Sequence, residues 1–243
     1  MMKKVLLVVF LFLYKNVNAQ HFELSFQTYG GLFHYSGGTT STESAVNLAS
    51  INGIYSSNNP FGSNNAFSYG FCAQASIIKK SGFMFGLKAG YEVLRSSLNI
   101  TSVFYNNYYL GNNNYDVFLS NQIAANGQTI LTSTQIVLNP FVGYRIKINK
   151  IKVDLMPGLD IGFNLKGTET DQAKDVTGKS YTTSFSINNV PTDIRIKFGT
   201  AVNYQRYGLT AGFSQGLTNL NRNVANNSAN SEFLQLGISY KLL

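Results

Sequence analysis

The chain has 243 residues and a formal charge of +8, yet only 12% of its residues are charged and 14% are aromatic. A typical soluble domain contains about 25% charged residues, so the deficit indicates that much of the surface does not face water. After residue 20, no stretch approaches the roughly 20 continuous apolar residues of a membrane helix, which favours a membrane β-barrel. The positive charge is dispersed, and it indicates contact with anionic lipopolysaccharide rather than with nucleic acid.

Residues 1–19 have the features of a secretory signal peptide. Two lysines precede the short apolar run Val5–Leu13, and Val17-Asn18-Ala19 resembles a small-residue cleavage site. We therefore expect a mature β-barrel domain of residues 20–243. Because Cys72 is the only cysteine, we expect no intramolecular disulfide and no lipoprotein anchor at the cleavage site.

Alternation of apolar and polar residues with a period of two predicts eight strands. The expected ranges are 22–35, 66–78, 83–100, 135–148, 151–166, 193–204, 207–214 and 234–242. The clearest pair of strands is the hairpin Gln135–Lys166, which turns at Asn149-Lys150. Each of its two strands is longer than the usual strand of a soluble protein. Four long segments, 36–65, 101–129, 167–191 and 217–231, are expected to be loops. Long loops that alternate with short turns are typical of bacterial outer-membrane barrels, and an even strand number places both mature termini in the periplasm.

The two faces of the predicted strands differ in residue size. One face carries Phe, Tyr, Leu and Ile, whereas the other is dense in Gly, Ser and Ala. Because an eight-stranded barrel has a narrow interior, the small residues suit the inside and the apolar stripes suit lipid. The predicted class is therefore all-β, an eight-stranded antiparallel transmembrane up-and-down β-barrel, rather than a soluble lipocalin-like barrel. Aromatic side chains near the strand ends are expected to form interfacial girdles, namely Phe67, Tyr69, Tyr144, Phe163, Tyr204, Tyr207 and Tyr240.

Charged residues of both signs share the inward face. Buried charges need partners away from bulk water, so we expect an ion-pair network that plugs the barrel and gives it a closed polar interior. A proton or ion pathway is the alternative interpretation of the same residues. The predicted interior charge network consists of Glu23, Lys88, Glu92, Arg145, Asp154, Asp160, Arg195 and Lys197.

Several short runs resemble a known group of barrels. The ending Leu-Gly-Ile-Ser-Tyr-Lys-Leu-Leu is similar to the carboxy-terminal signal that outer-membrane assembly machinery reads. With the Lys3-Lys4 start, the Ala19-Gln20 junction, Gly86–Glu92 (GLKAGYE) and Asn139–Ile146 (NPFVGYRI), this ending resembles the PorT-like outer-membrane β-barrel families of the Bacteroidetes. Their architecture is similar to the outer-membrane protein A and X barrels. The resemblance implies the fold and an outer-membrane location. Because PorT members take part in secretion, an accessory role in a secretion or uptake complex is a second hypothesis.

Patterns that indicate catalysis are few. The histidines are His21 and His34, so no metal site of the usual His/Cys kind is expected, and no phosphate-binding Gly loop indicates a cofactor. We therefore expect no enzymatic activity. His34-Tyr35-Ser36 is nevertheless similar to the His and Ser of lipid A deacylases, in which a base activates a serine against an acyl ester. A lipid A-modifying hydrolase is thus a third hypothesis, although its Glu is unassigned and simple interfacial polar residues explain the same pattern.

The main functional hypothesis concerns the long loops. Phe104–Tyr115 (FYNNYYLGNNNY) offers Tyr105, Tyr108, Tyr109 and Tyr115 for contact with a protein or a glycan, because Tyr supplies rigid amphipathic area. The same composition also suits a solvated loop without a ligand. We therefore expect a structural or interaction protein that acts through its outer loops.

Overall fold

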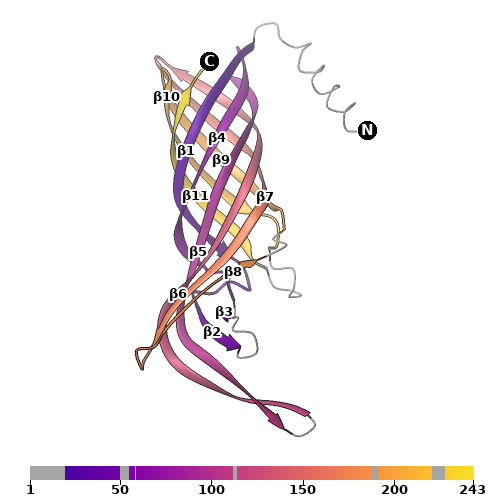
Figure 1. Ribbon diagram of the computed structural model, residues 1–243. Coiled ribbons are helices and arrows are strands. Elements are labelled where there is room, and N and C mark those ends of the chain that lie inside the picture. Colours follow the sequence, from indigo (N-terminus) through magenta and orange to yellow (C-terminus); the bar gives the residue numbers. More distant parts are fainter. Residues whose placement is uncertain (1–19, 50–54, 58, 112–113, 188–190, 221–227) are drawn as a thin grey trace.

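The computed structural model describes residues 20–49, 55–57, 59–111, 114–187, 191–220 and 228–243 (Figure 1). The predicted signal peptide, residues 1–19, lies outside the described residues. The strands are β1 (Gln20–Ser36), β2 (Glu43–Ala49), β3 (Tyr55–Ser57), β4 (Asn64–Lys79), β5 (Phe83–Gly111), β6 (Asn114–Ile148), β7 (Ile151–Asp175), β8 (Ser180–Ile187), β9 (Asp193–Tyr204), β10 (Tyr207–Gly216) and β11 (Asn230–Lys241). No helix among the described residues has the length and the apolar character that crossing a membrane demands.

Eight of these strands close into an antiparallel ring. The order is β1-β4-β5-β6-β7-β9-β10-β11, and β11 returns to β1 with a register from Ser25↔Lys241 to Ser36↔Asn230. A closed ring leaves no sheet edge, so the strands satisfy their backbone hydrogen bonds among themselves, as a bilayer requires. The predicted eight-stranded antiparallel transmembrane up-and-down β-barrel is confirmed.

The two ends of the barrel differ in their connections. Short turns join β4 to β5, β6 to β7 and β9 to β10, and both Gln20 and Leu243 lie at this same end (Figure 1). Asn149 (φ 54°) and Gln205 (φ 53°) adopt the left-handed conformation that a tight hairpin turn between twisted strands requires. We call this the turn end of the barrel and the opposite end the loop end.

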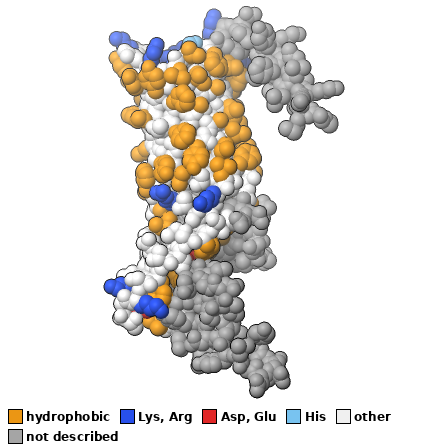
Figure 2. Space-filling view, in the orientation of Figure 1, with side chains coloured by type: hydrophobic (Ala, Val, Ile, Leu, Met, Phe, Trp, Pro, Cys, Tyr) orange, Lys and Arg blue, Asp and Glu red, His pale blue; other side chains and the backbone are white. Residues whose placement is uncertain are grey.

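A belt of apolar side chains surrounds the barrel wall, and Lys and Arg side chains border it at both edges (Figure 2). Leu236 and Ile238 are 67% and 63% exposed, values that suit contact with lipid rather than with the protein core. The predicted assignment of faces therefore agrees with the structure. We call this the apolar belt, and it includes Phe22, Phe26, Phe71, Leu87, Val142, Leu155, Leu159, Ile196, Phe198, Leu209, Leu236 and Ile238.

The prediction of loops is wrong for most residues of 101–129 and 167–191 and for part of 36–65. β5 and β6 continue as one long hairpin, β7 runs on to pair with β8, and β2 lies parallel to β5 (Figure 1). These stretches lack the lipid-facing alternation, but pairing with neighbouring strands and a small core still hold them as strands. For the fourth segment, 217–231, the structure agrees with the predicted loop, since β10 ends at Gly216 and β11 begins at Asn230.

We call the part beyond the apolar belt the loop-end extension. It comprises β2, β3, β8 and the continuations of β5, β6 and β7. Its own apolar core is formed by Val46, Ile100, Val103, Ala173 and Tyr181. The extension is therefore a folded unit rather than a set of separate loops.

Candidate functional site

The interior of the barrel contains two clusters of charged side chains. Arg145 is central to the cluster at the turn end, where its Nε and Nη2 donate to the two oxygens of Asp154 at 2.6 and 2.7 Å. Its Nη1 donates to Glu23 at 2.7 Å, and Glu23 also contacts Lys241. Bidentate charge-assisted hydrogen bonds of this kind are the strong ones, and they fix Arg145 between β1 and β7.

Arg195 is central to the second cluster and is fully buried. Its Nη2 lies 2.6 Å from Glu92 and 3.7 Å from Asp160, and its Nε lies 3.5 Å from Asp193. Lys197 lies 3.2 Å from Asp160. The guanidinium and the ammonium together offset three buried carboxylates in the middle of the barrel.

Neutral groups complete the surroundings of Glu92. The Tyr29 hydroxyl donates to Glu92 at 2.9 Å, and the Gln135 amide donates at 3.0 Å. The Tyr29 ring has room because a glycine lies beside it, since a Cβ at Gly70 would come within 2.8 Å of the ring. Sequence reasoning missed Tyr29, Gln135 and Asp193, although Asp193 shares the inward parity of Arg195.

Lys88 differs from the other predicted members of the network. It lies inside the barrel, but no carboxylate among the described residues forms an ion pair with it. Its Nζ instead donates to Gln27 Oε1 at 3.4 Å and lies 5.5 Å from the centre of the Phe141 ring. The other seven predicted residues each take part in at least one of the ion pairs above, whereas Lys88 is held by an amide and a ring.

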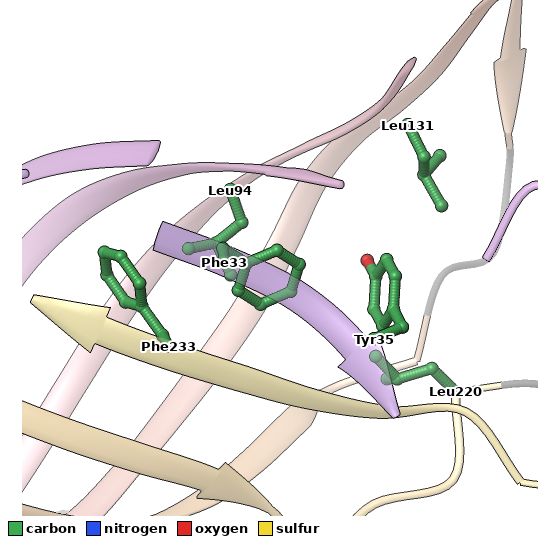
Figure 3. Close-up of a cluster of buried hydrophobic side chains, with 6 residues drawn as sticks. All are labelled: Phe33, Tyr35, Leu94, Leu131, Leu220 and Phe233. Carbon is green, nitrogen blue, oxygen red and sulfur yellow. The ribbon is translucent and has the colours of Figure 1, made fainter. Parts of the chain in front are cut away.

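The expectation of a closed polar interior needs a correction at the loop end. Phe33, Tyr35, Leu94, Leu131, Leu220 and Phe233 form a buried apolar layer across the barrel (Figure 3). The Phe33 ring packs edge-on against Tyr35 at 5.0 Å and against Phe233 at 6.2 Å. The inward face at this end is thus apolar, because the layer lies where the barrel meets the extension and packs against segments of both.

Little space remains between the interior side chains. One cavity lies beside Lys88, Glu92 and Asp160, another lies beside Arg145 and Asp154, and each has a volume of about 20 Å³. A cavity of this size accommodates about one water molecule. Side chains thus leave room for about one water molecule in each of these two interior cavities.

The predicted girdle residues are all outward and exposed. Tyr144, Tyr204, Tyr207 and Tyr240 lie towards the turn end, where Tyr207 and Tyr240 have ring centres 5.3 Å apart. Phe67, Tyr69 and Phe163 lie towards the loop end, and Phe67 stacks on Tyr69 at 6.5 Å. Their placement agrees with two rings of aromatic side chains, and their role at a lipid interface stays a prediction.

His34 and Ser36 lie on the outward side of β1, because the register of β1 continues through Gly30-Gly31 without a shift. The structure supplies a carboxylate that sequence reasoning missed, since Glu232 on β11 lies 3.5 Å from His34 Nε2. His34 Nδ1 lies 3.0 Å from Asn65 Oδ1. No hydrogen bond joins His34 to Ser36 in the described part of the chain. Glu232 lies two residues before the outward Leu234 and therefore points to the same outward face of β11. This alternation is the sequence signal that could have identified Glu232 as a neighbour of His34.

The proposed binding tyrosines belong to the far part of the extension. The backbones of Tyr105, Tyr108 and Tyr109 on β5 pair with β6, and the backbone of Tyr115 on β6 pairs with β5. Their side chains lie outside the described part of the structure, so the binding role stays a prediction. Within the described residues, no group of three or more His, Cys, Asp or Glu side chains is arranged to hold a metal ion.

Comparison with known proteins gives similarity at the level of solved structures. No protein-family model matches the sequence, and no curated protein matches it. The attachment invasion locus protein Ail of Yersinia pestis, solved in complex with the heparin analogue sucrose octasulfate, is 10% identical with a TM-score of 0.32. Neisserial surface protein A is 12% identical with a TM-score of 0.35. Each similarity covers 93% of this chain and 100% of the other chain. The barrel assignment rests on the strand pairing above, and the PorT-like resemblance stays a prediction.

Proposed function

We propose that this chain is an integral outer-membrane protein without enzymatic activity, which acts as a structural or interaction protein through its loop-end extension. The observation that carries the proposal is the contrast between a filled barrel and a folded extension beyond the apolar belt. Outer-membrane barrels keep short turns in the periplasm and longer segments outside the cell. The extension then faces the cell exterior, and both mature termini face the periplasm.

The interior supports a role other than transport. Paired charges fill the middle of the barrel, and the buried apolar layer covers the loop end. The two interior cavities described above are each of single-water size. An interior of this kind anchors the protein and holds the extension in place, while the extension meets a protein or glycan partner. The basic side chains at the edges of the apolar belt suit contact with lipopolysaccharide, since they lie where anionic headgroups begin.

The ending of the chain suits recognition during assembly. β11 closes the ring by pairing with β1 and β10, and Tyr240 and Leu242 are partly exposed. The outer-membrane assembly machinery is therefore the proposed partner during biogenesis.

A truncated protein tests the interaction role. Replacing residues 104–122 by a short Gly-Ser turn removes the far half of the β5–β6 hairpin and leaves the barrel strands intact. We expect both proteins to shift in gel mobility on boiling, as folded barrels do, and only the full chain to cross-link a partner on whole cells. A partner that the truncated protein also captures would argue against the extension. Loss of secretion on deletion would favour the accessory-subunit hypothesis, and ion conductance in planar bilayers would contradict the closed barrel.

A second candidate function is favoured by Glu232. A carboxylate beside an outward His, with Ser36 two residues away on the same face, is the residue set of a serine hydrolase that acts on lipid. Ser36 would attack an acyl ester of lipid A, His34 would pass the Ser36 proton to the leaving alcohol, and water would then release the fatty acid. This candidate is second because the described hydrogen bonds of His34 involve Asn65 and not Ser36.

Mass spectra of lipid A decide on the hydrolase. If the candidate is correct, Ser36→Ala and Glu232→Gln restore an acyl chain that cells with the natural protein lack. Thr28→Ala, an outward change on the same strand, leaves the spectrum as it was. Identical spectra from cells with and without the protein would remove this candidate.

A further inference from the structure

A hollow in the outer wall lies at the turn end of the barrel, beside the short turn between β9 and β10 (Figure 1). It has a volume of about 490 Å³ and extends over β1, β11, β10 and β9. The two interior cavities, by contrast, have a volume of about 20 Å³ each. Because the outward side chains that line the hollow are nearly all apolar, it suits a hydrocarbon chain.

The register of the four strands explains the hollow. Aromatic side chains form one row across the wall, namely Phe26, Tyr240, Tyr207 and Tyr204. The next row towards the loop end holds smaller side chains, namely Thr28, Ile238, Leu209 and Val202. Side chains stand roughly perpendicular to a sheet, so the rings extend further from the wall than the second row does. The wall therefore steps inwards beyond the aromatic row.

A basic group lies at the turn-end edge of the hollow. Arg206 is exposed in the turn between β9 and β10, and its Nη1 donates to the Tyr240 hydroxyl at 3.5 Å. The Arg206 carbonyl accepts a hydrogen bond from the Lys241 backbone N–H at 2.8 Å, which fixes the turn against β11. The charged neighbours of Arg206 in the described structure are tyrosines and not carboxylates. Its guanidinium is therefore available to an anion at the membrane surface.

We propose that the hollow binds a glycerophospholipid, with one acyl chain against the second row of side chains and the phosphate on Arg206. Aromatic rings and a basic side chain beside an apolar surface match the order of headgroup and chain in such a lipid. The choice of a phospholipid rests on the proposed function, because that orientation places the turn end in the periplasmic leaflet and lipopolysaccharide at the other end. The bound lipid is held at one place, unlike the lipid that surrounds the rest of the belt.

Native mass spectrometry of the mature chain in detergent tests the site, with dipalmitoylphosphatidylglycerol as the probe. Loss of a hydrogen bond to a charged group weakens binding about tenfold, so we expect Arg206→Gln to raise the Kd by about that factor. Leu209→Trp fills the hollow with an outward ring, and we expect it to abolish binding at the same lipid concentration. Dipalmitoylglycerol has the same chains without the phosphate and should bind the natural chain as weakly as the phospholipid binds Arg206→Gln.

Two matched variants separate the site from lipid that binds anywhere on the belt. Lys80→Gln removes an exposed charge from the turn between β4 and β5, and Leu159→Trp adds an outward ring on β7. Both are expected to keep the Kd of the natural chain. A shift in gel mobility on boiling confirms that every variant has a folded barrel.

Three results would overturn the proposal. The first is no binding, or binding that is equal in the natural chain and all variants. The second is a dimer that Leu209→Trp removes, which would assign the hollow to a second copy of this chain. The third is lipid A that binds here in dependence on Arg206, which would also contradict the proposed orientation. Cross-linking on whole cells tests the interaction role separately, so either proposal can fail without the other.

Discussion

The barrel and the loop-end extension use the same strands but solve different physical problems. In the barrel, every strand has a partner on both sides, and Arg195 alone lies within 4 Å of three carboxylates. In the extension, β8 pairs only with β7 in the described structure, and Glu169 and Asp171 are buried without a basic partner. A bilayer offers no water to unpaired groups, whereas the extension has solvent beside it. Complete pairing is therefore necessary in the barrel and optional in the extension.

The largest expected effect follows from removing the central cation of the barrel. Arg195→Met leaves Glu92, Asp160 and Asp193 close together with Lys197 as their remaining basic partner. Breaking a buried ion pair on one side costs about 3–5 kcal/mol. Urea unfolding in detergent, followed by gel mobility, measures the loss. Arg206→Met, in an exposed turn, is the control and should change the unfolding midpoint little.

A charge placed in the apolar belt tests which surface faces lipid. Leu159 is outward in the middle of the β7 part of the belt, and an Arg near the bilayer midplane costs about 2–4 kcal/mol. Leu159→Arg should therefore lower the free energy of unfolding measured from liposomes. Gln172→Arg, on the exposed face of the same strand within the extension, should be nearly neutral. Equal effects of the two changes would contradict the boundary between barrel and extension.

A smaller effect is expected from filling interior space. Gly70→Ala adds a Cβ that would lie 2.8 Å from the Tyr29 ring, whose hydroxyl donates to Glu92. Overpacking of this kind costs about 1–3 kcal/mol. Gly199→Ala is the matched inward control, since its nearest neighbour would be 3.5 Å away. Unfolding midpoints of the two variants in one detergent give the comparison, and similar midpoints would argue against tight packing around Tyr29.

The smallest effect on the whole protein concerns pH and is confined to the extension. Burial and Asp171 raise the pKa of Glu169 to about 7, from 4.5 in an unfolded chain. Protonated Glu169 therefore favours the folded extension below pH 4.5, and this contribution disappears as pH rises through 7. Exchange of the β8 amides, corrected for its intrinsic pH dependence, should accelerate between pH 5 and 8. Glu169→Gln should lack this acceleration, and a natural chain with a flat profile would contradict the shifted pKa.

Prediction from the sequence succeeds where the two-residue period has a strong physical cause. Leu209 and Leu236 must face lipid and Arg195 must not, so alternation alone identifies the barrel strands and their inward charges. Prediction fails where that constraint ends. Phe33 and Phe233 are inward and aromatic because they cover the barrel at the loop end, and the polar residues of β8 form a strand through pairing with β7. Glu232 and Ser57 were missed because their partners lie far away in the sequence.

The sequence by itself determined the class of fold, the lipid-facing stripes, the short turns and the identity of the inward charges. These features are local, since each follows from the alternation of side chains along one strand. Only the tertiary structure decided which charges meet, how the loop end is covered and that Ser57 lies beside Glu169. Closing the ring brings β1 against β11, and the first long segment folds back along β5 towards β7. Such contacts depend on the three-dimensional course of the chain, which no single strand encodes.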